Sequence, residues 1–180
     1  MSAPNPADDR AAPHSPRGSD VIVIGAGLAG LTAAALAARA GASVRLIAQG
    51  WAQQIVAPGW ISVWDGAEGG ALAAAGEAAT THPDHPYAVV GVQTIGPALD
   101  AFRAVAESVG LAYDMPAGGR NLRLPTALGA IQTPLMAPRG LAHGDLAELA
   151  GPVLLIGFRG WRDFQPELAA GNLRAGGIYA

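Results

Sequence analysis

The 180-residue sequence contains no cysteine, which excludes disulfides, thiolate zinc sites, cysteine-ligated iron–sulfur clusters and cysteine nucleophiles within this chain. Charge is also scarce. Charged residues make up 14% of the chain and the formal net charge is −3, so the sequence has no basic footprint for nucleic acid. Small and apolar residues are abundant instead: 51% of the chain is hydrophobic, and 25 glycines and 14 prolines predict frequent turns. The length suffices for one domain with a core.

Residues 1–19 contain four prolines and almost no large apolar side chain. This composition predicts a disordered leader, and the stretch lacks the apolar segment of a signal peptide. We therefore expect a single domain over residues 20–180. Together with the absence of cysteine, these features favour a cytoplasmic location.

The chain then enters a charge-free run from Val21 to Ala38, whose 18 residues reach the length at which a transmembrane helix becomes a candidate. The run is not uniform, however. It starts with the β-branched block Val21–Ile24 and ends in an alanine-rich stretch. A buried parallel strand followed by a helix accounts for this division better than a membrane span does.

Three glycines, Gly25, Gly27 and Gly30, separate the expected strand from the expected helix in the spacing G-x-G-x-x-G. In a dinucleotide-binding βαβ unit the first glycine permits the tight turn, the second lets a pyrophosphate approach the backbone, and the third allows close packing of helix on strand. The motif alone is weak evidence. Here it follows a strand, opens a helix and is completed by a second expected strand at residues 44–48, which makes it strong.

The expected nucleotide site comprises the glycine turn and the end of the second strand. An acidic residue usually ends that strand and binds the ribose hydroxyls, but Ala48 and Gln49 stand there instead. Gln49 offers one uncharged hydrogen bond, so the residues leave open whether a flavin or a nicotinamide nucleotide binds. The candidate cofactor-binding residues are Gly25, Ala26, Gly27, Leu28, Ala29, Gly30 and Gln49.

Beyond Gly50 the sequence predicts further elements. We expect a short helix within residues 67–80 and a helix from Pro97 to Gly110. Residues 120–137 are typical of two short strands across a turn, forming a small antiparallel insertion. A buried strand is expected over 151–160, followed by a helix to about residue 175. The predicted apolar face of the second helix comprises Leu99, Phe102, Ala106 and Val109, and Asp163 is the predicted cap of the last helix.

Few side chains outside the glycine turn indicate chemistry. His82 and His85 have a spacing that suits a metal, but Pro83 and Pro86 interrupt the helix that such a pair needs, so we predict no metal site. No histidine has a neighbour that marks it as a base, and we name no catalytic residue. The sequence around Asp145 is similar to a Gly-Asp motif of flavoproteins, but no apolar strand precedes it. The tryptophans Trp51, Trp60 and Trp64 are interpreted as loop packing rather than as flavin contacts.

Several segments together resemble the N-terminal part of one family, the B subunit of anaerobic glycerol-3-phosphate dehydrogenase. They are VIVIGAGLAGLTAA, the His85-Pro86-Tyr87 triplet, LRLPTALGAIQTPLMAP and above all VLLIGFRGWRDFQPELAAGNLR. The glycine motif is common to many flavoproteins, whereas the last two segments are much more specific. The resemblance extends over nearly all of the chain from Asp20 onward.

The resemblance implies a flavoprotein subunit, with FAD by fold and FMN as the alternative. It implies glycerol metabolism: oxidation of sn-glycerol 3-phosphate to dihydroxyacetone phosphate, with electron transfer to a quinone. The implied partners are a second flavoprotein subunit and an iron–sulfur subunit that links the complex to the inner face of the cell membrane. Four arginines of this region, Arg123, Arg139, Arg159 and Arg162, are candidates for a substrate phosphate, with solvent-facing charge as the alternative.

Members of this family are markedly longer than 180 residues, and the late strands of their flavin domain have no counterpart here. We therefore expect an apparently truncated α/β fold: a Rossmann-like FAD/NAD(P)-binding parallel sheet that exposes apolar surface and depends on another chain or dissolves poorly. Three alternatives stay open. They are an FAD-dependent oxidoreductase with another substrate, a non-catalytic fragment or assembly subunit, and a nicotinamide-binding domain.

Overall fold

The computed structural model describes residues 18–50, 57–66 and 69–180, and the chain divides into two compact units, Met1–Ala52 and Gln53–Ala180. The expected leader falls almost entirely outside the described residues, as does Trp51. No helix within the described parts has both the length and the apolar character needed to cross a membrane.

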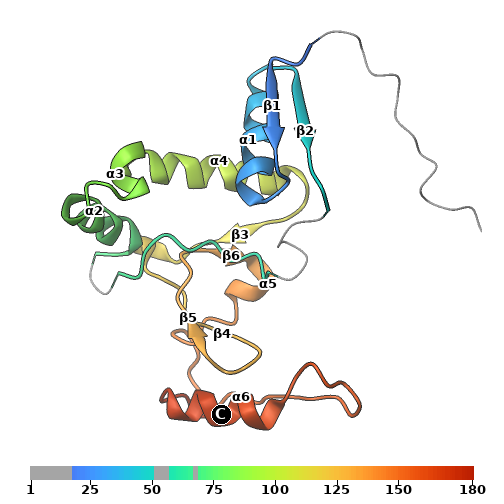
Figure 1. The fold of residues 1–180 in the computed structure, drawn as a ribbon. Helices are drawn as coiled ribbons and strands as arrows, with labels where there is room; N and C mark the ends of the chain where they lie inside the picture. Colours follow the sequence, from blue (N-terminus) through green and yellow to red (C-terminus); the bar gives the residue numbers. More distant parts are fainter. Residues whose placement is uncertain (1–17, 51–56, 67–68) are drawn as a thin grey trace, which may run out of the picture. The chain divides into compact units, whose positions relative to one another are not determined.

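The first unit is the βαβ arrangement expected from the sequence. Strand β1 (Val21–Ile24) leads into helix α1 (Leu28–Arg39), and strand β2 (Val44–Ile47) returns to pair with β1 in parallel. The β-branched residues of β1 suit a strand, and the alanine-rich segment suits a helix. Figure 1 shows α1 lying along the two strands.

The sheet of the first unit is covered by α1 on one face only. Val23 faces the helix, because a Cβ placed on Gly30 of α1 would lie 3.4 Å from Val23 Cγ1. Ile22 and Ile24, on the opposite face, are 58% and 84% exposed, and Ile47 beside them is 49% exposed. Parallel sheets are ordinarily buried on both faces. We expected a larger parallel sheet, but the parallel sheet of the described residues has two strands.

The uncovered face of this sheet should drive association of the purified chain. Ile22 lies opposite Arg45 in the parallel register, so I22E exchanges an exposed apolar side chain for a partner to that guanidinium. We expect the wild-type chain to form concentration-dependent oligomers in analytical ultracentrifugation and I22E to form markedly fewer. The matched control is V109E, at a 77% exposed valine of the second unit, which should associate as the wild type does. A wild-type chain that is monodisperse at all concentrations would contradict this prediction.

The second unit begins with helices. They are α2 (Ala71–Thr81), α3 (Pro86–Val90), the 3-10 turn η3 (Val92–Thr94) and α4 (Ile95–Ser108). Both predicted helices are therefore confirmed. Three residues of the predicted apolar face of α4, Leu99, Phe102 and Ala106, pack against Tyr113 and Met136. The fourth, Val109, was wrongly assigned to that face: the helix has ended at Ser108, and Val109 lies exposed at its cap.

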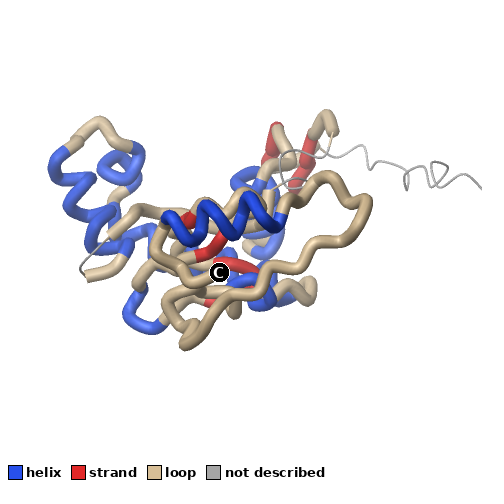
Figure 2. Tube along the Cα trace, turned by 90° about the horizontal axis from the view of Figure 1, so that it is seen from below, coloured by secondary structure: helices blue, strands red, loops and turns tan. Residues whose placement is uncertain are grey.

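The middle of the second unit consists of very short strands joined by turns, and Figure 2 shows how much of the chain as a whole is loop. Its elements are β3 (Tyr113–Asp114), η4 (Ala117–Gly119), β4 (Leu124–Pro125), β5 (Ile131–Gln132), β6 (Ala137–Pro138) and α5 (Arg139–Ala142). Strand β4 pairs with β5 in antiparallel fashion, as predicted within residues 120–137, and β3 pairs with β6, also antiparallel, which the sequence did not predict. A second apolar cluster forms here from Leu122, Leu124, Ala137 and Ala142, with Trp60 packed against it.

The C-terminal part departs from the sequence prediction at two points. Residues 151–160 do not form the expected buried strand, and Leu154 and Ile156 are 82% and 65% exposed. The segment has no strand neighbour in the described residues, and its backbone bond to the rest of the chain runs from Val153 N to Tyr179 O over 2.8 Å. Helix α6 (Pro166–Ala175) ends where expected. Asp163 does not cap it, because the helix begins at Pro166 and its N-cap residue is Gln165.

Candidate cofactor-binding site

The glycine turn of the first unit has the geometry that its motif predicts. Gly25 directly follows β1 and has a φ of 104°, a backbone conformation that residues with a Cβ rarely adopt. Its N–H donates to the carbonyl oxygen of Ile47 over 2.8 Å, which fixes the turn to the last residue of β2. The turn therefore lies at the carboxyl edge of both strands, where ligands bind in open α/β sheets.

Gly30 holds the helix close to this turn. A Cβ built on Gly30 would lie 2.0 Å from the carbonyl oxygen of Gly25, far inside van der Waals contact. The clash is with backbone, so no side-chain rotation relieves it. The third glycine of the motif thus performs the close packing that its position predicts.

The first turn of α1 offers free donors to an anion. Gly27 is the N-cap and makes no side-chain cap bond, and the first turn holds no acidic residue. The first backbone bond of the helix runs from Leu31 N to Gly27 O over 2.8 Å. The N–H groups at positions 28–30 precede it and have no partner within the helix. Together with the positive end of the helix dipole, they fit a pyrophosphate.

The remaining candidate, Gln49, lies two residues beyond β2 and is exposed. Its contact with a nucleotide stays a prediction. At the opposite end of the strands, the Asp20 carboxylate accepts from Ser43 N over 2.9 Å, while Asp20 N donates to Ser43 O over 2.9 Å. This clamp fixes the starts of β1 and β2, and the sequence pattern did not predict it. The available signal was an acidic residue placed directly before a strand.

The segment around His85 is structural. Its Nδ1 accepts from Tyr87 N over 3.2 Å and so caps α3, and its ring contacts Trp64 and Tyr87 edge-on at centroid distances of 5.4 and 4.7 Å. Tyr87 also donates through its hydroxyl to Val63 O over 2.7 Å. His82 is exposed and takes no part in this cluster. The described residues contain no group of three or more metal-ligating side chains.

Asp145, from the segment that resembles a flavoprotein Gly-Asp motif, is turned inward. It is 2% exposed and accepts from the backbone N–H groups of Arg123 and Ala147 and from the guanidinium of Arg120 over 2.7 Å. Burial alone would raise its pKa, but these three hydrogen bonds outweigh burial and hold the pKa below the ordinary value. The residue anchors the loops of the second unit, and its oxygens are not free for a cofactor.

The candidate arginines separate into two kinds. Arg139 lies at the start of α5 and forms a two-pronged ion pair with Asp114, with Nε to Oδ2 at 3.0 Å. Arg123, Arg159 and Arg162 are exposed and form no ion pair with the described residues, and of these three Arg159 lines a cavity beside α6. Of the four arginines, Arg159 is the one that the structure places at a cavity with its guanidinium unpaired by the described residues.

A parallel βαβ unit with a tight glycine turn and an uncapped helix N-terminus is typical of nucleotide-binding α/β proteins. The chain belongs to the FAD-binding domain family, whose model matches residues 20–180. FAD is accordingly the cofactor of this family. No solved structure matches the chain.

Among curated proteins, the chain is similar to the B subunit of anaerobic glycerol-3-phosphate dehydrogenase from Aliivibrio fischeri, at 30% identity over 86% of this chain and 36% of the relative. The probable B subunit of the same dehydrogenase from Halobacterium salinarum is 34% identical over 89% of this chain and 37% of the relative. The B subunit from Mannheimia succiniciproducens is 28% identical over 86% and 37%. The chain spans just over a third of the length of these relatives.

Proposed function

We propose that this chain is the FAD-binding part of an oxidoreductase that oxidises sn-glycerol 3-phosphate and passes the electrons on to a quinone. The observation that carries the proposal is the turn between β1 and α1, in which Gly25 adopts a positive φ and Gly30 abuts its carbonyl oxygen. The family match supports the cofactor, and the names of the similar proteins support the substrate. The quinone, the partner subunits and attachment to the membrane surface belong to the same proposal.

In this proposal the residues of the chain bind and orient rather than react. The N–H groups at the start of α1 hold the pyrophosphate, and Gln49 reaches the nucleotide ribose with one uncharged hydrogen bond. When bound, FAD supplies the hydride acceptor for the secondary alcohol carbon of the substrate. The role of the first unit is to position the cofactor, and the groups that contact the phosphates are backbone N–H groups rather than side chains.

Anaerobic mixing of the flavin-loaded chain with sn-glycerol 3-phosphate tests the proposal. We expect the visible flavin absorption to bleach with this substrate and to stay unchanged with glycerol, which has the same carbon skeleton but no phosphate. The assay is run with the chain alone and with membranes that hold its partner subunits. Bleaching by other alcohols or amines but not by glycerol 3-phosphate would assign a different substrate. A flavin that no substrate reduces, even with partners present, would contradict an enzymatic role.

A further inference from the structure

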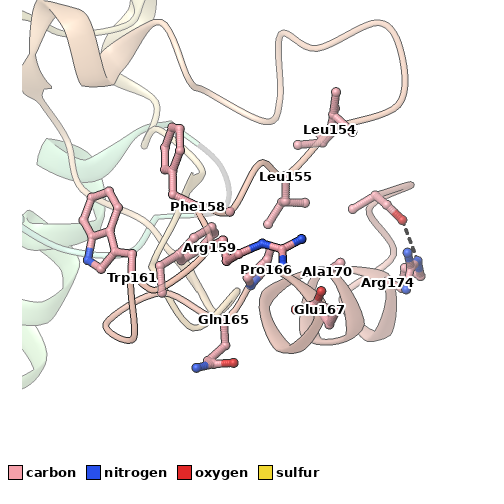
Figure 3. A pocket seen from close by; sticks show the side chains of 14 residues that line it. Leu154, Leu155, Phe158, Arg159, Trp161, Gln165, Pro166, Glu167, Ala170 and Arg174 are labelled. Atoms are coloured by element: carbon pink, nitrogen blue, oxygen red, sulfur yellow. Dashed lines mark hydrogen bonds between the residues drawn. The ribbon is translucent and has the colours of Figure 1, made fainter.

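The cavity beside α6 lies entirely in the second unit and has no place in the cofactor site. Its volume is about 600 Å³, within the range of small-molecule sites. It lies between residues 153–161 and helix α6, and Figure 3 shows both sides. Its walls combine polar and apolar groups, with Leu155, Phe158 and Trp161 among the apolar lining residues. Ligand pockets use a few well-placed polar groups beside apolar surface to fix the orientation of the ligand.

One cationic side chain dominates the centre of this cavity. In Figure 3 the guanidinium of Arg159 extends across the cavity above Pro166, the first residue of α6. Arg159 makes no ion pair or hydrogen bond with any described residue. The other charges that line the cavity are Arg174, whose Nε donates to Ala180 O over 2.5 Å, and the exposed Glu167. The cavity therefore has one guanidinium that the described residues leave uncommitted.

We infer that this cavity binds a glycerol phosphate group, with Arg159 as the residue that holds the phosphate. A guanidinium presents paired donors that match a phosphate in two-pronged fashion. The choice of phosphate over carboxylate rests on the proposed function, whose substrate carries one. The same group occurs in two sources, free sn-glycerol 3-phosphate and the headgroup of a phospholipid such as phosphatidylglycerol. Leu154 and Trp161, which line the cavity and are exposed, suit the second source.

The test is a binding titration of the full 180-residue chain with sn-glycerol 3-phosphate, glycerol and inorganic phosphate. A parallel arm measures co-sedimentation with vesicles of phosphatidylglycerol and phosphatidylcholine against vesicles of phosphatidylcholine alone. We expect saturable binding of glycerol 3-phosphate or of phosphatidylglycerol vesicles, and none of glycerol. R159A should weaken this binding by about tenfold or more. R159K should restore only part of the affinity, because lysine lacks the paired N–H donors of the guanidinium.

The matched control is R162A, which removes the same charge three residues away from a side chain that does not line the cavity. We expect it to change the affinity by less than about twofold. Equal losses in R159A and R162A would mean unspecific attraction and would overturn the inference. Absence of binding in both arms would overturn it as well.

These readouts require no flavin, so they separate this inference from the proposed function. If binding depends on Arg159 but no substrate reduces the flavin, the binding site is supported and the proposed enzymatic function is contradicted. If glycerol 3-phosphate reduces the flavin and R159A leaves its Michaelis constant unchanged, the enzymatic function is supported and the binding site is contradicted. Circular dichroism of R159A should match the wild type, since the side chain is exposed.

Discussion

Replacing Gly30 with alanine should abolish retention of FAD by the purified chain. The added methyl group would lie 2.0 Å from the carbonyl oxygen of Gly25, and neither atom belongs to a side chain that can rotate away. The helix must therefore retreat from the turn, which displaces the N–H groups at its N-terminus from the phosphates. We expect flavin content to fall from near one per chain to less than a tenth, measured by absorption after acid release.

The matched control is Gly76→Ala, a glycine inside α2 where an added Cβ meets nothing within 4 Å. Alanine has a better helix propensity by about 1 kcal/mol, so this variant should be as stable as the wild type or more so, with unchanged flavin content. A G30A chain that keeps its flavin would show that the turn does not hold the cofactor. Equal losses in the two variants would point to a general loss of folding instead.

Replacing Asp145 with alanine should have the largest effect on the stability of the second unit. The change leaves the part-buried N–H groups of Arg123 and Ala147 without their acceptor and removes one of the two carboxylate partners of Arg120. Losses of this kind cost about 2 to 4 kcal/mol, even with Arg120 partly solvated. Urea unfolding followed by tryptophan fluorescence measures the difference. In contrast, Glu148→Ala removes an exposed partner of the same Arg120 and should cost less than about 1 kcal/mol.

The depressed pKa of Asp145 predicts how this contribution depends on pH. Because the folded pKa is below the unfolded value, the stabilisation is fully present above the unfolded pKa of about 3.9 and is lost as the pH falls through the folded pKa. The wild type should therefore lose its advantage over Asp145→Asn in strongly acidic solution and keep it near neutrality. An advantage that does not change with pH would contradict an ionised Asp145.

The βαβ unit and its glycine turn were predictable because their signals are local. A β-branched block, three glycines at fixed spacing and an alanine-rich stretch each follow from backbone conformation, and β1, α1 and β2 appear where these signals place them. The antiparallel pair β4–β5 was predictable for the same reason, since two apolar stretches flank a turn at Gly129.

Features that depend on distant parts of the chain could not be predicted from the sequence pattern. Residues 151–160 have the composition of a buried strand, but a strand exists only where neighbours pair with its backbone, and the described residues supply none. The burial of Asp145 depends on Arg120 and on two backbone groups brought in by folding. The position of Arg159 over a cavity likewise requires α6 to lie opposite the 153–161 segment. Spacing in the sequence carries none of this information.

The flavin content of the purified 180-residue chain tests the central claim most directly. The chain is purified without added cofactor, its visible spectrum is recorded, and the pigment released by acid is identified by chromatography as FAD, FMN or neither. The turn between β1 and α1, together with the family match, predicts FAD in near-stoichiometric amount. A colourless protein that takes up no FAD on titration would contradict the claim, because the turn would then be a feature of the fold alone.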